Sequence, residues 1–270
     1  MMKKVILVTG ASSGIGLACA NALQADGHIV YGSTRNLANM KSVSFKPIEL
    51  DITDDISVKN AVDKIIKAEG KIDVLVNNAG DGIAGPSYAT PVDIAKKQFE
   101  VNFFGVVRIS NAVLSGMIAS KNGLIINLSS IAGLMGLPYV GFYVASKYAI
   151  EGYSQSLRME LRSTGIKVVL LNLGDFATGF TGSRSKVPFA IKDAKLEADY
   201  NTVMEKIEKD ETGGSDPAIV GKKVAKIVAS SSPSHRYLIG KLGQLISVPL
   251  KRILPGGLFE KSINDYYNIK

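Results

Sequence analysis

The chain has 270 residues, a formal net charge of +8 and 46% hydrophobic residues, which is enough apolar material for a large core. This length fits one α/β domain, so we expect a single domain over residues 1–270. The basic residues form no dense tract, which argues against nucleic-acid binding. The single cysteine, Cys19, excludes an intramolecular disulfide framework and is typical of a reducing compartment.

The first residues read Met-Met-Lys-Lys and lead directly into the apolar run Val5 to Val8. This run is too short for the apolar core of a signal peptide and continues into a glycine-rich turn. We therefore predict a buried strand and a cytoplasmic protein.

Short apolar runs alternate with helical patterns along the chain. The runs predict strands at 4–9, 28–33, 45–50, 73–77, 123–129, 166–172 and 235–239. Helical patterns lie near 14–26, 54–69, 91–120, 140–164 and 217–231. Nearly all the runs are continuously apolar, as in strands covered on both faces. The sequence therefore predicts an α/β fold, a doubly wound Rossmann-type parallel sheet with helices on both faces.

Two segments depart from this rhythm. Residues 174–200 follow a predicted strand end, where open α/β sheets hold ligands, and contain Phe176, Phe180 and Phe189; we interpret them as a substrate lid. Residues 240–270 form an apolar and basic extension that prolines and glycines interrupt. We favour its docking on a neighbouring subunit or on the domain itself over contact with a membrane surface.

The first strand runs into a glycine-rich turn, Thr9 to Gly16. Gly10 would permit a sharp exit from the strand, Gly14 would let the backbone approach a pyrophosphate, and Gly16 would allow close helix–strand packing. Such a turn by itself is also compatible with a purely structural role.

Tyr143 and Lys147 lie four residues apart, and Ser130 precedes Tyr143 by thirteen residues. On a helix, residues at this spacing are neighbours, so an ammonium would lie beside a phenol. A nearby cation lowers the pKa of a phenol from its usual value of about 10. Together with the glycine turn, this pair predicts a proton donor that serves a hydride transfer.

These motifs, with Asn77-Asn78-Ala79-Gly80 and Asn102, occur in the order and spacing of the short-chain dehydrogenase/reductase family, which residues 3 to 178 resemble. The stretch from Gly133 to Pro138 is similar to the corresponding stretch of 17β-hydroxysteroid dehydrogenases. The resemblance implies an oxidoreductase that interconverts a carbonyl and a secondary alcohol as a homodimer or homotetramer. A cofactor-binding sensor and a nucleotide-sugar epimerase are the alternatives.

The resemblance also implies roles for individual residues. Tyr143 would be the general acid in reduction and the general base in oxidation. Lys147 would lower its pKa and bind the nicotinamide ribose, while Ser130 would hold the substrate oxygen. Asn102 would bind a water that links Lys147 to solvent, or would only satisfy a backbone carbonyl. The implied cofactor-binding residues are Gly10, Ser12, Ser13, Gly14, Ile15, Gly16, Arg35, Asp51, Ile52, Asn78, Ala79, Gly80, Tyr143, Lys147 and Thr178.

Three of these assignments have alternatives or weak points. Asn78 is expected to brace the sheet beside the cofactor rather than touch it, and Asp51 could instead cap a helix. Thr178 would meet the nicotinamide carboxamide, but the family's Pro-Gly is Leu173-Gly174 here, which leaves that loop less constrained.

The end of the second strand predicts the choice of cofactor. NAD-specific members carry an acid there, which binds the ribose hydroxyls and repels a 2′-phosphate. Here Thr34 takes that place and Arg35 follows. A guanidinium is a natural partner of a phosphate, so we predict NADP(H), with NAD(H) possible if Arg35 points to solvent.

Apolar side chains indicate the class of substrate. Met135, Leu137 and Tyr88, with the lid phenylalanines, would form an apolar pocket if they converge. That favours a lipid-like, steroid-like or aromatic carbonyl compound. The alternative is that several of these residues only pack the lid or a subunit contact.

Overall fold

The computed structural model describes residues 2–40, 42–187 and 193–269. Its centre is a seven-stranded parallel sheet of order β3-β2-β1-β4-β6-β7-β9. These strands are β1 (Val5–Val8), β2 (Ile29–Thr34), β3 (Lys46–Glu49), β4 (Val74–Asn77), β6 (Gly123–Ser130), β7 (Ile166–Leu173) and β9 (Arg236–Ile239). The fold class and all seven predicted strands are confirmed, with each strand end within one residue of its prediction.

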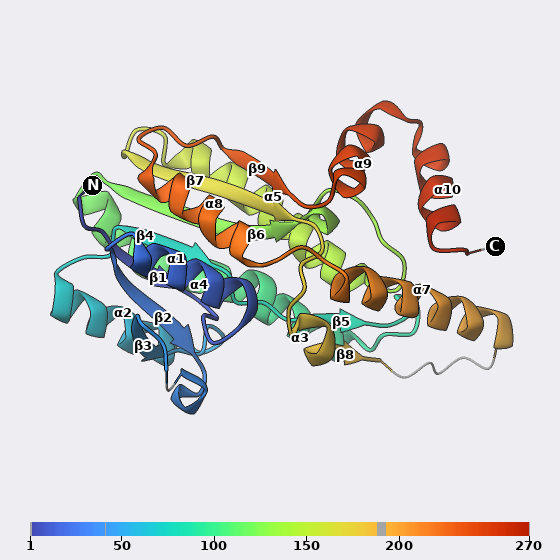
Figure 1. Cartoon of the computed structure of the whole chain (residues 1–270), viewed down its shortest axis with the longest axis horizontal. Helices are drawn as coiled ribbons and strands as arrows, with labels where there is room; N and C mark the ends of the chain where they lie inside the picture. The colour runs from blue at the N-terminus through green and yellow to red at the C-terminus, as the bar shows by residue number, and fades with distance from the viewer. Residues whose placement is uncertain (1, 41, 188–192, 270) are drawn as a thin grey trace.

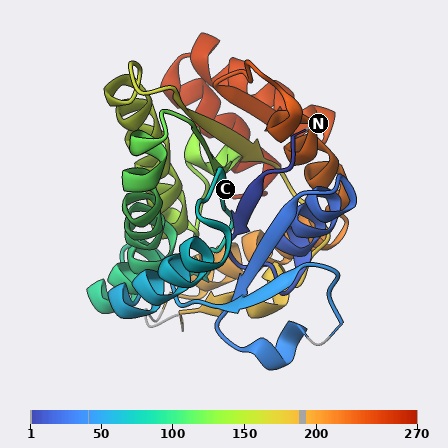
Figure 2. The same cartoon turned by 90° about the vertical axis from the view of Figure 1, so that its left-hand side faces the viewer.

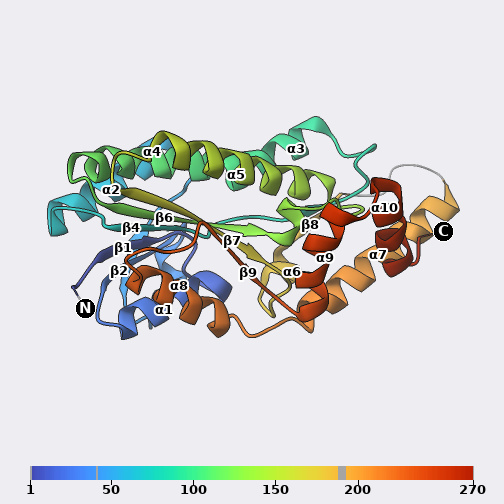
Figure 3. The ribbon, with the colours of Figure 1, turned by 90° about the horizontal axis from the view of Figure 1, so that it is seen from above.

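Helices cover both faces of the sheet, which lies between two helical layers in Figures 2 and 3. One layer holds α1 (Gly14–Ala25) and α8 (Ala218–Ala229). The other holds α2 (Asp55–Glu69), α4 (Gly105–Ala119) and α5 (Gly141–Glu160). The short 3-10 turns η1 (Leu37–Met40) and η3 (Ile131–Gly133) follow β2 and β6.

The continuous apolar runs have a direct structural explanation. In β1, Ile6 and Val8 pack into the core formed with α1 and α8, whereas Val5 and Leu7 pack into the core formed with α2 and α4. Since successive side chains of a strand point to opposite faces, a strand covered on both faces must be apolar at every position.

The predicted helix over 91–120 is interrupted. It consists of α3 (Val92–Phe99), a π-helical turn η2 (Glu100–Phe104) and α4. By length and hydropathy the run Val92–Ala119 could cross a membrane, but Ile109, Val113 and Met117 pack against the sheet, as in the core helix of a folded domain. The π turn contains Asn102, and π turns often mark functional positions.

The remaining elements gather beyond the carboxyl ends of the strands, at the right of Figure 1. The lid segment contains α6 (Phe180–Ser183) and β8 (Ser185–Lys186), and β8 pairs in parallel with β5 (Ile83–Ala84). Most of α7 (Ala194–Thr212) lies beyond the predicted lid, which did not anticipate a helix. Phe189 lies outside the described residues.

The C-terminal extension forms two helices, α9 (Leu242–Ile253) and α10 (Gly256–Tyr266). Pro249 lies inside α9 without ending it, so the prediction that it breaks a helix is wrong; Pro255 does separate the two helices. Val248 and Phe259 are buried against Met135, and Lys251 Nζ donates to the Leu134 carbonyl at 2.8 Å. The extension thus docks on its own domain, one of the predicted arrangements.

Candidate active site

A cavity of about 1200 Å³ opens at the carboxyl ends of the strands. The glycine turn, the ends of β2, β4, β6 and β7, the lid, and helices α9 and α10 line it. Every predicted cofactor residue lines this cavity, from Gly10 in the turn to Thr178 in the lid, and so does Ser130. Asn102 does not.

The glycine turn fits a dinucleotide pyrophosphate. Gly10 and Gly14 have φ values of +65° and +53°, which disfavour any residue with a Cβ. A Cβ on Gly16 would lie 2.2 Å from the Gly10 carbonyl oxygen, so only glycine permits this close approach. The first turn of α1 has no acidic residue, and the N-cap Ser13 side chain bonds none of its N–H groups. This helix end can therefore receive an anion.

Asn78 holds the glycine turn against β4. Its Nδ2 donates to the carbonyls of Thr9 at 2.9 Å and Gly10 at 3.0 Å. The Thr9 hydroxyl in turn accepts from the backbone N–H groups of Asn78 and Ala79, both at 3.0 Å. These contacts give Asn78 the bracing role that the sequence indicates, although it also lines the cavity.

The cavity wall at the end of β2 contains Thr34, Arg35 and Asp51. Thr34 is buried, whereas Arg35 is exposed. Burial would raise the pKa of Asp51, but hydrogen bonds from Thr53 and then the charges of Arg35 and Arg108 lower it overall. Asp51 accepts from the N–H and hydroxyl of Thr53 at 2.9 and 2.7 Å. The N-cap of α2 is Asp54, so the capping alternative for Asp51 is wrong.

The three residues of the predicted proton-transfer group lie together. Ser130 and Tyr143 hydrogen-bond through their hydroxyls, and the Ser130 hydroxyl also bonds the Leu173 carbonyl at 3.2 Å. Lys147 lies beside Tyr143 on α5, with Nζ 5.8 Å from the centre of the phenol ring and 3.1 Å from the Leu128 carbonyl oxygen. The neighbouring Ser129, which also lines the cavity, is buried and its hydroxyl has no partner among the described residues.

The predicted lowering of the Tyr143 pKa is wrong for this structure. Burial raises the pKa of Tyr143 to about 12, and the hydrogen bond between its hydroxyl and that of Ser130 opposes this only in part. Burial also lowers the pKa of Lys147 to about 8, against the opposing charge of Glu151. Desolvation is the largest effect on both groups, because it disfavours the charged form of each side chain.

Asn102 contacts the loop after β4 rather than the cavity. Its amide accepts from the Asp81 N–H at 2.8 Å and donates to the Asp81 carbonyl at 3.0 Å and to the Ser146 hydroxyl at 3.1 Å. These contacts match the alternative, satisfaction of neighbouring backbone groups. A water relay from Asn102 to Lys147 stays a prediction.

The apolar residues predicted for the substrate side converge only in part. Met135, Leu137, Phe176 and Phe180 line the cavity, and the Phe180 ring lies 6.0 Å from the Tyr143 ring. Tyr88 does not line it; this side chain is 57% exposed, so its assignment to the pocket is wrong.

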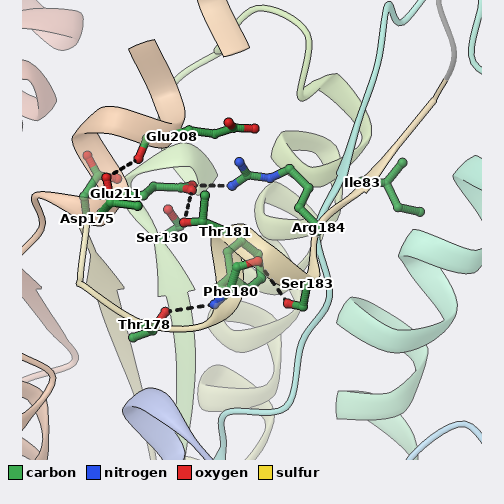
Figure 4. A network of polar contacts seen from close by, with 12 residues as sticks. Ile83, Ser130, Asp175, Thr178, Phe180, Thr181, Ser183, Arg184, Glu208 and Glu211 are labelled. Atoms are coloured by element: carbon green, nitrogen blue, oxygen red, sulfur yellow. Dashed lines mark hydrogen bonds and ion pairs between the residues drawn. The ribbon is translucent and has the colours of Figure 1, made fainter. Parts of the chain in front are cut away.

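The cavity also has a polar wall that sequence reasoning missed. Figure 4 shows its centre, where Arg184 in the lid pairs with Glu211 of α7 and Asp175 lies next to Glu211. Tyr267, beyond α10, completes this wall. Asp175 alone had a signal, since it is a charged residue just beyond the carboxyl end of β7. No pattern in the sequence points to Glu211 or Tyr267, because α7 and the chain beyond α10 are far from the strand ends in the sequence.

The loop that lacks the family's proline is held by other contacts. The Gly174 N–H donates to the Ile239 carbonyl at 2.8 Å, and the Asp175 N–H donates to Gln244 Oε1 at 3.2 Å. A Cβ on Gly174 would lie 2.1 Å from that same oxygen. Contacts with β9 and α9 thus fix the backbone at Gly174 and Asp175, where the sequence lacks the family's proline.

Comparison with known proteins agrees with this geometry. A family model described as short chain dehydrogenase matches residues 4–187, more than half of the chain. The chain belongs to the short-chain dehydrogenase family.

Three relatives of this short-chain dehydrogenase are informative. A 3-ketodihydrosphingosine reductase of Bacteroides thetaiotaomicron is 41% identical, with 100% of each chain covered. An NADPH-dependent 3-dehydrocapnine reductase of Ornithobacterium rhinotracheale is 34% identical, covering 86% of this chain and 87% of the relative. A solved short-chain dehydrogenase from Streptomyces avermitilis is 29% identical, with a TM-score of 0.81 and coverage of 94% and 96%.

Membership establishes the class of reaction. As a short-chain dehydrogenase, the protein is an oxidoreductase that interconverts an alcohol and a carbonyl compound with a nicotinamide cofactor. The glycine turn and the residues around Tyr143 fit such a cofactor, because they form one continuous wall of the cavity.

Proposed function

We propose that this short-chain dehydrogenase is an NADP(H)-dependent reductase of a long-chain, lipid-like ketone of the 3-ketodihydrosphingosine kind. The observation that carries the proposal is the 41% identity, over the full length of both chains, to a 3-ketodihydrosphingosine reductase.

The apolar part of the cavity supports a long-chain substrate. Side chains from the segment between η3 and α5 and from the C-terminal helices α9 and α10 line it together. They are Met135, Leu137, Val140, Leu250, Phe259 and Ile263. An alkyl chain that lies along this wall would be removed from water, at about 0.8 kcal/mol for each CH₂ group. A short polar ketone would gain little of this free energy.

The protonation states favour ketone reduction. With a pKa of about 12, Tyr143 keeps its proton at neutral pH and can give it to the carbonyl oxygen as negative charge develops there. Ser130 can stabilise the same oxygen by a hydrogen bond. Lys147, still mostly an ammonium below its pKa of about 8, would stabilise the tyrosinate that remains. The chemistry that a nicotinamide cofactor supplies when bound is a hydride for the carbonyl carbon.

NADP(H) is the proposed cofactor because Arg35 follows β2 directly and the last residue of β2 is Thr34 rather than an acid; the carboxylate on this wall, Asp51, comes after β3. Arg35 is exposed at the cavity wall, where a 2′-phosphate could pair with its guanidinium. Thr34 occupies the position of the acid that would repel such a phosphate. The NADPH-dependent relative supports this choice. We also propose a cytoplasmic homo-oligomer, as the single cysteine and the family suggest.

The test is NADPH oxidation, followed by absorbance, with a long-chain 3-ketone and a short polar ketone as substrates. We expect a higher kcat/KM for the long-chain ketone. Tyr143→Phe should lower kcat by about 10² to 10⁴-fold, because the proton donor is lost. Tyr88→Phe is the matched control, since Tyr88 is exposed and does not line the cavity.

Each part of the proposal can fail separately. Equal kcat/KM for the two ketones would contradict the lipid-like substrate, and a preference for NADH would contradict the cofactor. Cofactor binding without turnover of any ketone would favour a sensing role instead.

A further inference from the structure

Three carboxylates line the polar wall of the substrate cavity, Asp175 after β7 and Asp210 and Glu211 near the end of α7. Two of them are neutralised within the protein. Asp210 pairs with Lys206 at 3.1 Å, and Glu211 pairs with the largely buried Arg184 (Figure 4). Asp175 has no ion pair among the described residues. Its carboxylate therefore differs from its neighbours.

Asp175 is held in place without being neutralised. Its Oδ2 accepts a hydrogen bond from the neutral amide of Gln244. Lys241 acts on it only weakly, and the Lys241 ammonium donates to the Gly213 carbonyl at 2.6 Å. Burial, followed by the charges of Glu211 and Asp210, raises the pKa of Asp175 to about 6. A cation placed beside this carboxylate would stabilise its ionised form.

A second, independent feature of the wall is the Tyr267 hydroxyl. Tyr267 is 7% exposed and lines the cavity, yet its hydroxyl has no hydrogen-bond partner among the described residues. Burial and then the charge of Asp175 raise the pKa of this hydroxyl, so it stays neutral and faces the acidic wall. Because Tyr267 lines the cavity, its hydroxyl oxygen can accept a hydrogen bond from a ligand bound there.

This wall is close to the reacting groups. Ser130 hydrogen-bonds the carbonyl of Leu173, two residues before Asp175, and the charge of Asp175 helps to raise the pKa of Tyr143. The Asp175 carboxylate therefore lies within electrostatic range of Tyr143, which would hold the ketone oxygen.

We infer that Asp175 and Tyr267 form a cation subsite that binds an ammonium group on the carbon next to the reacting carbonyl. An ammonium has three N–H donors, and here it meets a carboxylate and a phenol oxygen, which both accept. The ligand class is a protonated long-chain 2-amino ketone, and 3-ketodihydrosphingosine has this chemistry. The inference rests on the proposed function, because it specifies the head group of the ketone that the cavity accepts.

The test compares two ketones with the same alkyl chain, a long-chain 2-amino-3-ketone and the 3-ketone that lacks the amine. The readout is the ratio of their kcat/KM values in the full-length enzyme with NADPH. Wild type should prefer the amino ketone. Asp175→Asn, which keeps the shape and the contact with Gln244, should lower the ratio by about tenfold to a hundredfold, mainly through KM.

A second pair of variants guards against a purely structural effect. Tyr267→Phe removes only the hydroxyl and should lower the ratio by about threefold to tenfold. Tyr88→Phe is its matched control, because Tyr88 is 57% exposed and does not line the cavity; its ratio should remain that of wild type.

The outcomes separate this inference from the proposed function. Turnover of both ketones with an unchanged ratio in Asp175→Asn would overturn the cation subsite and leave the reductase intact. An equal loss on both ketones would also overturn it, since the residue would then be structural. If wild type reduces neither ketone, the proposed function itself has failed.

Discussion

The two halves of the cavity are built in different ways. The cofactor half consists of the glycine turn and the residues around Tyr143, which follow strand ends or share one helix. The substrate half combines the lid, α7, α9 and the chain beyond α10, which are far apart in the sequence. The cofactor half therefore has local motifs, whereas the substrate half exists only after distant helices have packed at the carboxyl edge of the sheet.

The two halves also use glycine for different purposes. Gly16 allows two backbones to approach, and no neighbour can yield to a Cβ there. Gly174 makes room for the side chain of Gln244, which can move. A methyl group at Gly16 therefore tests the cofactor half of the cavity, and one at Gly174 tests the substrate half. We expect the substitution at Gly16 to cause the larger loss of ligand binding.

The largest effect is expected for Gly16→Ala. Its Cβ would lie 2.2 Å from the Gly10 carbonyl oxygen, so the turn must deform and the pyrophosphate site with it. We expect NADPH binding, measured by fluorescence titration, to weaken by about a hundredfold or more. Gly116→Ala in α4 is the control, because its Cβ meets nothing within 4 Å. Unchanged affinity in Gly16→Ala would show that close backbone approach is not what the cofactor half depends on.

Arg35→Asp tests the other end of the cofactor half. Replacing the guanidinium by a carboxylate removes a partner of the 2′-phosphate and adds a repulsive charge. The ratio of kcat/KM with NADPH to that with NADH should fall by about tenfold to a hundredfold. Arg162→Asp, an exposed position outside the cavity, controls for the change in net charge. If the ratio does not move, Arg35 points to solvent and does not select the cofactor.

Gly174→Ala tests the substrate half. The new Cβ would displace Gln244, which then loses its hydrogen bonds to Asp175. We expect the KM for the ketone to rise by about tenfold, with the KM for NADPH as the internal reference. Gln244→Ala should reproduce the effect if the lost contact is its cause. A larger change in the KM for NADPH than for the ketone would contradict the division into two halves.

The smallest effect concerns stability. The pKa of Asp175 is raised to about 6 from 3.8, so the folded protein binds this proton more tightly than the unfolded chain does. The stability of the wild type therefore falls as pH rises from about 4 to 6, and the full penalty is present above pH 6.

Removal of this charge should therefore stabilise the fold. Asp175→Asn should be more stable by about 1–2 kcal/mol at pH 8, a rise of roughly 2–6 °C in Tm. The difference should vanish below pH 4. Thermal unfolding at both pH values measures it, and a less stable variant at pH 8 would show that the carboxylate has a structural role.

Local patterns predicted most of the fold. The seven strands follow from apolar runs, because a strand covered on both faces must be apolar throughout. α7 is missed because the predicted lid, whose first part is rich in Gly and Ser, extends to residue 200 and so includes the first residues of this helix. The sequence predicts that Pro249 breaks a helix. In the structure α9 continues through Pro249, and its neighbour Val248 packs against the domain. In these cases tertiary contacts overrode a local preference.

The candidate site divides in the same way. The sequence by itself determined the family, the parallel sheet and the spacing that brings Ser130, Tyr143 and Lys147 together, because strand ends and helix turns are local geometry. Only the tertiary structure decided the direction of the Tyr143 pKa and the acidic wall around Asp175. Both depend on desolvation and on the charge of Glu211 in α7. Burial between elements far apart in the chain is a property of the packed fold.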